Sequence, residues 1–212
     1  MLSLVVLAGG ESRRMGRNKA LIPLAGKPLI QWVVDRLGPL ADETLVLANE
    51  PAPYSFLSLP VIADTVRGMG ALGGLYSALC SASNQWAAIV ACDMPFVSPT
   101  LLQYELELAD SDAFDVILPL SRGGAEPFHA LYRREGCLPL ICEALGRGER
   151  RVGSWMEHAK VQEIDDSTVA RLDSRGLCFL NVNTPEELTL AELEASRLVS
   201  PIKMGQANKV VG

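Results

Sequence analysis

Apolar runs alternate with stretches of helical spacing through the first half of the chain. Near-continuous apolar runs are typical of strands buried on both faces of a parallel sheet, and they occupy residues 2–8, 43–48, 60–63, 86–91 and 114–118. Apolar side chains spaced to share one face of a helix occur in residues 29–37, 71–82 and 99–109. The alternation predicts an α/β fold: a Rossmann-like open, mostly parallel sheet with helices on both faces.

The pattern changes after Gly123. Residues 126–132 predict a strand that runs antiparallel, and a helix is expected over about 134–145 and a last one from 185 to about 198. No internal repeat or low-complexity linker divides the chain, so residues 1–198 are expected to form a single domain. Residues 199–212 are expected to be a flexible tail, since from 200 onward they show neither periodicity nor an aromatic residue.

Composition excludes several classes of protein. Of the 212 residues 49% are hydrophobic and 21% charged, which excludes whole-chain disorder. A net charge of −6 argues against a nucleic-acid binder. The N-terminal apolar stretch is too short for a membrane helix and lacks the basic residues of a secretory signal. Five cysteines without a CxxC pair and only two histidines predict a reduced, cytoplasmic protein without a zinc site.

The segment after the first apolar run has the composition of a phosphate-binding loop. Gly9 and Gly10 allow the backbone to come close to a ligand, and cations follow them, among them Arg14 and Lys19. The loop is expected at the carboxyl end of the first strand, where open α/β sheets bind ligands. Its spacing matches neither the Walker pattern nor GxGxxG. From these residues alone, a surface turn with solvated basic side chains is an equal alternative.

Asp93 directly follows the apolar run 86–91, so its side chain is expected at a strand end. A carboxylate there is suited to Mg²⁺, which takes one or two protein carboxylates together with phosphate oxygens. The alternative is an aspartate that caps the next turn. Asp64 likewise closes the short run 61–63.

Residues 7–29, LAGGESRRMGRNKALIPLAGKPL, closely resemble the nucleotidyltransferase signature LAGGxSxRMGxxKxLxxxxGxPL. The remainder resembles the molybdenum cofactor guanylyltransferases of the MobA type, in residues 47–49, 64 with 68–74, 91–95, 148–152 and 179–188. The resemblance covers nearly the whole chain, to about residue 195, and implies a nucleotide-diphospho-sugar transferase-like fold. It also implies transfer of GMP from Mg-GTP to the terminal phosphate of Mo-molybdopterin, with release of pyrophosphate.

The resemblance assigns roles to individual residues. Lys19, Asp93 and Arg14 are implied to be catalytic, with Asp93 holding Mg²⁺. The implied nucleotide-binding residues are Leu7, Ala8, Gly9, Gly10, Lys19, Asn49, Asp64 and Asp93.

The resemblance places Asp64 against guanine, and its chemistry suits that role. A carboxylate accepts from both the N1–H and the N2–H₂ groups of guanine, a donor pair that adenine and cytosine lack. Asn49 would add polar contacts to the base or ribose. The alternative for both residues is a loop polar group that is satisfied within the protein.

Asn181 and Asn183 are the candidates for binding the acceptor. Spaced two apart on an extended segment, they would project from the same face and offer amides to a pterin. The alternative is a turn before a helix that begins with the capping box of Thr184 and Glu187. His129 is expected to be a core or strand residue, and Arg150–Arg151 either bind the acceptor phosphate or form a solvated charged run.

Three other functions stay open. Two are enzymes of the same superfamily, a molybdopterin cytidylyltransferase and a sugar-phosphate nucleotidyltransferase. The third is a non-catalytic nucleotide-binding maturation factor, against which Lys19 and Asp93 argue because a binder needs no metal carboxylate. The expected partners are GTP, Mo-molybdopterin and a molybdoenzyme or its maturation chaperone, with no nucleic acid and no membrane.

Overall fold

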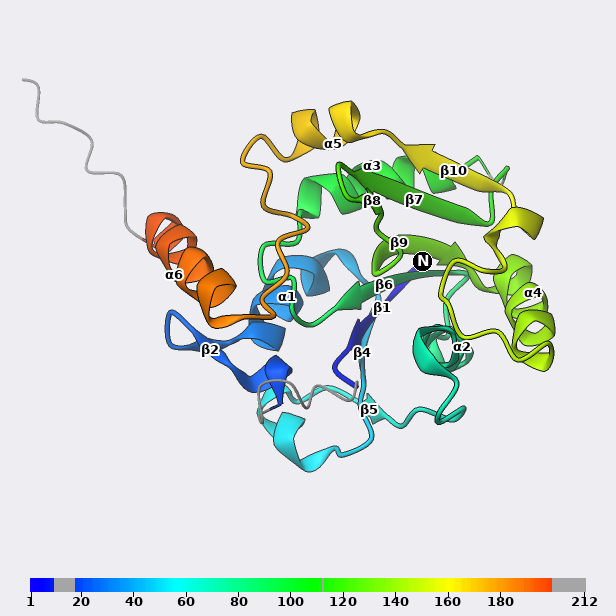
Figure 1. Ribbon diagram of the computed structural model, residues 1–212, viewed down its shortest axis with the longest axis horizontal. Helices are drawn as coiled ribbons and strands as arrows, with labels where there is room; N and C mark the ends of the chain where they lie inside the picture. The colour runs from blue at the N-terminus through cyan, green and yellow to red at the C-terminus, as the bar shows by residue number, and fades with distance from the viewer. Residues whose placement is uncertain (10–17, 112, 200–212) are drawn as a thin grey trace, which may run out of the picture.

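The computed structural model describes residues 1–9, 18–111 and 113–199. The main eight-stranded sheet has the order β10-β7-β9-β6-β1-β4-β5, with β8 paired to β7 (Figure 1). The strands are β1 (Leu2–Leu7), β4 (Glu43–Leu47), β5 (Val61–Ile62), β6 (Trp86–Ala91), β7 (Val116–Ser121), β8 (Gly124–Ala125), β9 (His129–Arg133) and β10 (Val161–Ile164). Strand β9 runs antiparallel to β6 and β7, and β8 is antiparallel to β7, whereas the other pairs are parallel.

Helices cover both faces of this sheet, as predicted. One face packs on α1 (Leu29–Leu37), α3 (Pro99–Ala109) and α5 (Asp166–Leu172), and the other on α2 (Gly70–Ser81) and α4 (Arg134–Gly146). Helix α6 (Pro185–Val199) packs beside the small β2–β3 hairpin (Pro23–Leu24 and Lys27–Pro28). No described helix has the length and apolar composition to span a membrane.

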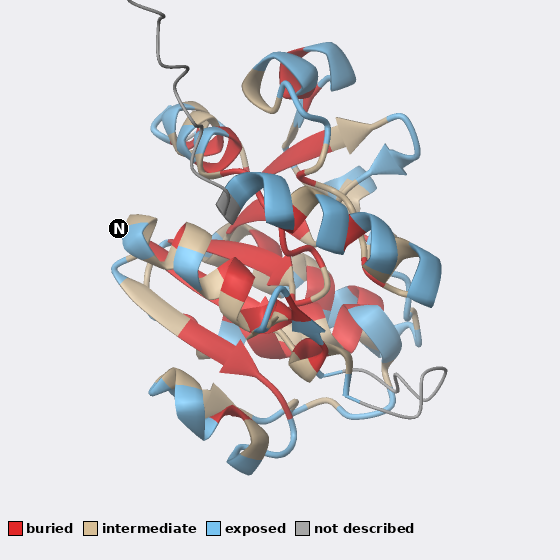
Figure 2. Cartoon of the chain, turned by 90° about the vertical axis from the view of Figure 1, so that its left-hand side faces the viewer, coloured by how far each residue is buried: buried red, intermediate tan, exposed pale blue. Residues whose placement is uncertain are grey.

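Alternating side chains of the central strands supply the two cores. On β1, Leu4 and Val6 pack toward α1 and α3, while Val5 packs toward α2 and α4. Figure 2 shows the resulting layers, with buried strands between helices whose outer faces are exposed. Burial on both faces explains why β1 reads as a continuous apolar run.

The order of the strands fixes where a ligand can bind. From β1 the chain moves outward to β4 and β5, then crosses back to β6 on the other side of β1. Ligands of open α/β sheets bind at such a reversal, beyond the carboxyl ends of the strands. Here Cys92, just past β6, donates its backbone N–H to the Leu7 carbonyl (3.1 Å). The segments that follow β1 and β6 therefore begin side by side.

Several element boundaries differ from the predictions. Strand β7 starts at Val116 instead of 114, because Asp115 turns its carboxylate to Arg133 and to the Lys160 backbone N–H. Strand β9 starts at His129 instead of 126, since His129 N–H closes a turn onto the Glu126 carbonyl (3.0 Å). Helix α6 extends to Val199, the first residue of the expected tail; the rest of that tail lies outside the described residues.

Two adjacent glycines in α2 allow a stability prediction with an internal control. A Cβ added at Gly73 would lie 2.8 Å from the Val66 carbonyl oxygen and 2.9 Å from Met69 Cβ, whereas one at Gly74 meets nothing within 4 Å. Gly73→Ala should therefore lower the free energy of unfolding by about 1–3 kcal/mol through overpacking. Gly74→Ala should raise it by about 0.5–1 kcal/mol, because alanine costs less entropy in a helix. Urea unfolding of both variants measures the difference; equal effects would contradict the packing.

Candidate functional site

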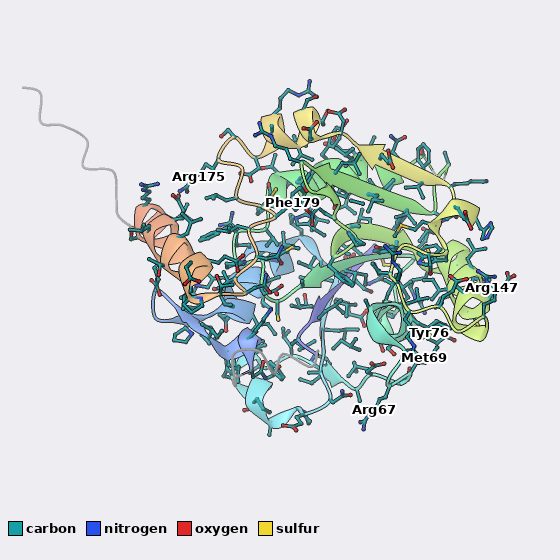
Figure 3. All side chains as sticks on the ribbon, in the orientation of Figure 1. Arg67, Met69, Tyr76, Arg147, Arg175 and Phe179 are labelled. Carbon is teal, nitrogen blue, oxygen red and sulfur yellow. The ribbon has the colours of Figure 1, made fainter. Side chains whose placement is uncertain are left out.

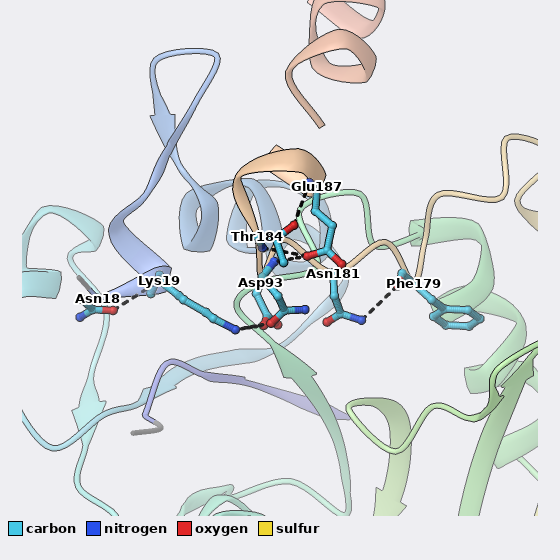
Figure 4. A network of polar contacts seen from close by, with 9 residues as sticks. Asn18, Lys19, Asp93, Phe179, Asn181, Thr184 and Glu187 are labelled. Atoms are coloured by element: carbon cyan, nitrogen blue, oxygen red, sulfur yellow. Dashed lines mark hydrogen bonds and ion pairs between the residues drawn. The ribbon is translucent and has the colours of Figure 1, made fainter. Parts of the chain in front are cut away.

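Lys19 and Asp93 meet beyond the ends of the central strands (Figure 4), and Asn183 joins them through a hydrogen bond with Lys19. Lys19 Nζ lies 3.4 Å from Asp93 Oδ2 and donates a hydrogen bond to Asn183 Oδ1. The Lys19 and Asp93 side chains are only 20% and 18% exposed, so their charges are less screened than those of a surface pair. Asp93 and Asn183, which are 74 and 164 positions from Lys19 in the sequence, thus form one polar cluster with it.

Backbone contacts on both sides position Asp93. The N–H of the preceding residue, Cys92, donates a hydrogen bond to the Leu7 carbonyl at the end of β1, and the Asp93 carbonyl accepts one from the Val182 N–H (2.9 Å). The carboxylate is therefore held between the end of β1 and residues 179–183, hereafter the acceptor segment. This placement at the end of β6 agrees with the strand-end position predicted for Asp93.

Tyr54 and Asn18 position Lys19. Asn18 caps the short 3₁₀ helix Lys19–Leu21 by accepting from the Ala20 N–H (3.1 Å), and its amide donates to the Tyr54 hydroxyl (2.8 Å). Tyr54, which is 1% exposed, in turn donates to the Ala8 carbonyl (3.1 Å). Burial raises the pKa of Tyr54, which keeps the hydroxyl a donor. Sequence motifs gave no indication of Tyr54, because its role depends on tertiary contacts.

The end of β1 approaches its neighbour closely. The Ala8 N–H donates to the Leu47 carbonyl (3.0 Å), and a Cβ at Gly9 would lie 3.4 Å from that same oxygen. The hydrogen bond holds Ala8 against β4, and a Cβ at Gly9 would make only an ordinary van der Waals contact there, so the packing against β4 does not itself require glycine. Gly10 and Arg14, the other predicted residues of this loop, lie outside the described residues.

Asp64 and Asn49 lie together beyond the ends of β5 and β4. Asn49 Oδ1 accepts from the Asp64 N–H (3.2 Å). Asp64 Oδ1 accepts from the Val66 N–H (2.9 Å) and from the Ser77 hydroxyl (2.7 Å), which ties this loop to α2. Oδ2 of Asp64 forms no hydrogen bond within the described parts of the chain. A ligand's donors would therefore converge on this one oxygen, and Ser77, which carried no sequence signal, sets its orientation.

The capping box predicted at the start of α6 is present, and it also orders the acceptor segment. Glu187 N–H donates to Thr184 Oγ1 (3.2 Å), and Glu187 Oε2 accepts from the Thr184 N–H (2.9 Å) and the Asn183 N–H (2.6 Å). Asn181 donates from Nδ2 to the Phe179 carbonyl (3.2 Å). Helix capping is thus present at this segment, and it uses the side chains of Thr184 and Glu187, not those of Asn181 and Asn183.

Arg150 and Arg151 do not lie next to the acceptor segment. The Arg150 carbonyl accepts from the Leu72 N–H (3.1 Å) at the start of α2, and Arg151 lines a cavity of about 520 Å³ with Val152, Gly153, Ser154 and Glu157. Figure 3 shows Met69, just before α2, and Phe179 of the acceptor segment on opposite sides of the sheet end. The arginine pair is therefore placed on the α2 side and not next to Asn181 and Asn183.

The donor set suits a hard cation bound together with phosphates. Asp93 supplies one carboxylate, and the described residues hold no cluster of three or more His, Cys, Asp and Glu side chains. Mg²⁺ commonly takes one or two carboxylates and completes its octahedron with phosphate oxygens and water. The residues present therefore fit Mg²⁺ that arrives with a triphosphate and do not form an all-protein cage.

Known proteins are similar to this chain over most of its length. The model of the MobA-like NTP transferase domain matches residues 4–163. A probable molybdenum cofactor guanylyltransferase of Natranaerobius thermophilus is 32% identical, covering 90% of this chain and 94% of the relative. A molybdenum cofactor guanylyltransferase of Vibrio vulnificus is 35% identical, covering 89% and 94%.

Solved structures agree in fold. Molybdopterin-guanine dinucleotide biosynthesis protein A of Archaeoglobus fulgidus superposes with a TM-score of 0.79 at 28% identity, covering 92% of this chain and 99% of that one. The 4-diphosphocytidyl-2C-methyl-D-erythritol synthase of Anaerococcus prevotii shares the fold alone, with a TM-score of 0.69 at 10% identity and coverage of 92% and 96%. The match over residues 4–163 and the relatives above 30% identity establish that the chain belongs to the MobA-like NTP transferase family of nucleotidyltransferases.

Proposed function

We propose that this protein transfers GMP from Mg-GTP to the terminal phosphate of Mo-molybdopterin, forming the guanine dinucleotide form of the cofactor and releasing pyrophosphate. The observation that carries the proposal is the convergence of Lys19, Asp93 and Asn183 at the strand-order reversal of the sheet. Relatives named molybdenum cofactor guanylyltransferases, at 32% and 35% identity over about nine-tenths of the chain, support the choice of substrates.

In this mechanism the protein positions two phosphates and neutralises their charge. An oxygen of the acceptor phosphate attacks the α-phosphorus of GTP in line, while the bond from that phosphorus to the pyrophosphate oxygen breaks. No side chain needs to form a covalent intermediate, because phosphoryl-type transfers depend mainly on positioning and electrostatics. Lys19 would bind phosphate oxygens, with backbone from Leu7 to Gly10 beside them and Arg14 in the same role as Lys19.

Asp93 would hold Mg²⁺. When bound, the ion supplies Lewis-acid neutralisation of the phosphate oxygens. Asp93 orients Lys19 through their 3.4 Å contact, so that the lysine cation and the metal carboxylate face the same ligand. Asn183, bonded to Lys19, and Asn181 would present amides to the pterin side of the acceptor. We further propose cytoplasmic action, with a molybdoenzyme or its maturation chaperone receiving the product.

Guanine would be recognised by Asp64, with Asn49 as a neighbour that fixes the loop. Oδ2 of Asp64 is the oxygen left for the N1–H and N2–H₂ donors, since Oδ1 already accepts two hydrogen bonds. A carboxylate left unpaired by the wrong base discriminates strongly, because desolvating it costs free energy.

Replacement of Asp64 tests the guanine assignment. Asp64→Asn keeps an amide oxygen for the bonds to Val66 and Ser77 but presents an NH₂ group where guanine offers donors. GTP affinity should fall about 10- to 100-fold, and CTP affinity should change less than about threefold. Titration calorimetry measures both. An unchanged GTP Kd in a normally folded variant would remove Asp64 from base recognition.

Calorimetry of the wild-type protein with GTP, CTP, ATP and UTP, each with and without Mg²⁺, tests the proposal as a whole. A preference for GTP of at least tenfold, or about 1.4 kcal/mol, is expected. A preference for CTP would move the assignment to the cytidylyl reaction. Binding of no nucleotide would contradict the proposal, whereas binding without pyrophosphate release in the presence of the acceptor would favour the non-catalytic nucleotide-binding maturation factor.

A further inference from the structure

Two ionisable side chains lie in the core beneath the acceptor segment without hydrogen bonds. Glu105, on α3, is 0% exposed, and His129, at the start of β9, is 1% exposed. Their closest polar atoms, His129 Nδ1 and Glu105 Oε1, are 3.5 Å apart, which is long for a hydrogen bond. Neither carboxyl oxygen nor ring nitrogen has a hydrogen-bond partner in the part of the chain that the structure describes.

Keeping such groups in the core is unfavourable. Burial raises the pKa of the Glu105 carboxyl, and the neighbouring His129 opposes that shift. Replacing both members of a buried polar pair by apolar residues is often neutral or even stabilising. The pair is therefore poorly explained as a contribution to stability, and its surroundings give another explanation.

His129 connects the pair to the acceptor segment. Its ring meets the Phe179 ring edge to face, with centroids 5.4 Å apart and planes at 89°. The Phe179 carbonyl accepts from the Asn181 amide (3.2 Å), and Val182, three residues on, bonds to the Asp93 carbonyl (2.9 Å). A series of contacts thus links Glu105 on α3, through His129 on β9, to Phe179. The Phe179 carbonyl in turn holds the Asn181 amide.

We propose that Glu105 and His129 are positioning residues for the acceptor: the Glu105 carboxyl, whose Oε1 lies 3.5 Å from His129 Nδ1, sets the orientation of the His129 ring, which fixes Phe179 and through it the Asn181 amide. An edge-to-face contact depends on ring orientation in a way that aliphatic packing does not. The inference rests on the proposed function, because the ligand that Asn181 would hold is the acceptor. Neither Glu105 nor His129 contacts Asp64 or Asn49, the candidates for nucleotide binding. Replacing the pair should therefore weaken binding of the acceptor and leave binding of GTP unchanged.

The double variant Glu105→Leu with His129→Leu tests this inference, because it removes the orienting contact and leaves an apolar core. The thermal midpoint should stay within a few degrees of wild type or rise, and the GTP Kd should stay within about twofold. The acceptor KM should rise about tenfold, with a smaller change in kcat. Glu105→Gln, which keeps the shape and a polar contact to His129, should stay within about threefold of the wild-type acceptor KM.

Ile141→Val is the matched control. It trims a buried side chain of α4 in the core on the opposite face of the sheet, so it should lower the thermal midpoint slightly without changing the acceptor KM. A rise in acceptor KM in this control equal to that in the double variant would overturn the inference, since general destabilisation would then explain both.

A spectroscopic readout without substrates separates this inference from the proposed function. The side-chain NH₂ resonances of Asn181, observed by ¹⁵N NMR, should shift or broaden in the double variant and keep their positions in Ile141→Val. Unchanged resonances together with an unchanged acceptor KM would overturn the positioning role while wild-type transfer stands. Wild-type protein that binds GTP but transfers nothing to Mo-molybdopterin would overturn the proposed function, and the acceptor role of the pair with it.

Discussion

Asp93→Asn should lower kcat about 100- to 1,000-fold while the protein remains folded, as expected for the loss of one preorganised electrostatic group. The substitution keeps the size of the side chain and the backbone bond from Val182. It removes the negative charge that would hold Mg²⁺ and orient Lys19. Steady-state pyrophosphate release measured across a range of Mg²⁺ concentrations checks the prediction, and the Mg²⁺ concentration at half-maximal rate should rise.

Asp35→Asn is the control for this result. Asp35 forms an ion pair with Lys27 (2.5 Å), but both side chains are about 40% exposed, and surface pairs contribute little. Its kcat should stay within about twofold of wild type. If Asp93→Asn behaved like Asp35→Asn, Asp93 would be a turn-capping residue and the assignment of the metal to it would fail.

Lys19→Ala should also lower kcat about 100- to 1,000-fold, because it removes the cation that meets both Asp93 and Asn183. Lys27→Ala removes the cation of the exposed pair and should leave kcat nearly unchanged. Quench-flow measurement of a single turnover separates the chemical step from substrate binding. A single-turnover rate within threefold of wild type would exclude Lys19 from the transfer step.

The double variant Lys19→Ala with Asp93→Asn tests whether Lys19 and Asp93 act as a unit. Groups that serve one transition state are strongly non-additive, so the double variant should lose little more than the more damaging single variant. Fully multiplicative losses would instead indicate independent roles, in conflict with their 3.4 Å contact.

Strand ends were the most predictable part of the site. Strand β6 and helices α1 and α3 have the predicted bounds, because their apolar patterns coincide with burial and because Pro28, Gly38 and Pro99 mark ends of the two helices. Parallel strands bring their carboxyl ends to one edge, so Gly9, Asn49, Asp64 and Asp93 were expected at the same side of the sheet from pattern alone. Residue type and position suggested phosphate binding for Gly9 and Mg²⁺ binding for Asp93, whereas the nucleotide-binding roles of Asn49 and Asp64 came from the family resemblance.

The supporting contacts could not be predicted. Tyr54 bonds to Asn18 and Ala8, which are 36 and 46 positions away, and Ser77 bonds to Asp64 across 13 positions. Neither contact leaves a periodic or motif signal in a single sequence. His129 was correctly predicted as a strand residue of the core, but its partner Glu105 looks like an ordinary polar residue on a helix until α3 packs on β9.

Short elements were missed for a related reason. Strand β10 has four residues with one buried side chain, and it acquires its place only by pairing with β7. Helix α5 has seven residues, too few for a helical period to stand out. Tertiary pairing, rather than local propensity, determines both elements.

The most direct test is the reaction itself: purified wild-type protein with Mg²⁺, Mo-molybdopterin and either GTP or CTP, followed by pyrophosphate release and mass spectrometry of the pterin product. We expect a guanine dinucleotide product and a kcat/KM for GTP at least about tenfold above that for CTP, a difference of about 1.4 kcal/mol. Faster reaction with CTP, or pyrophosphate release from neither nucleotide, would contradict the proposed function.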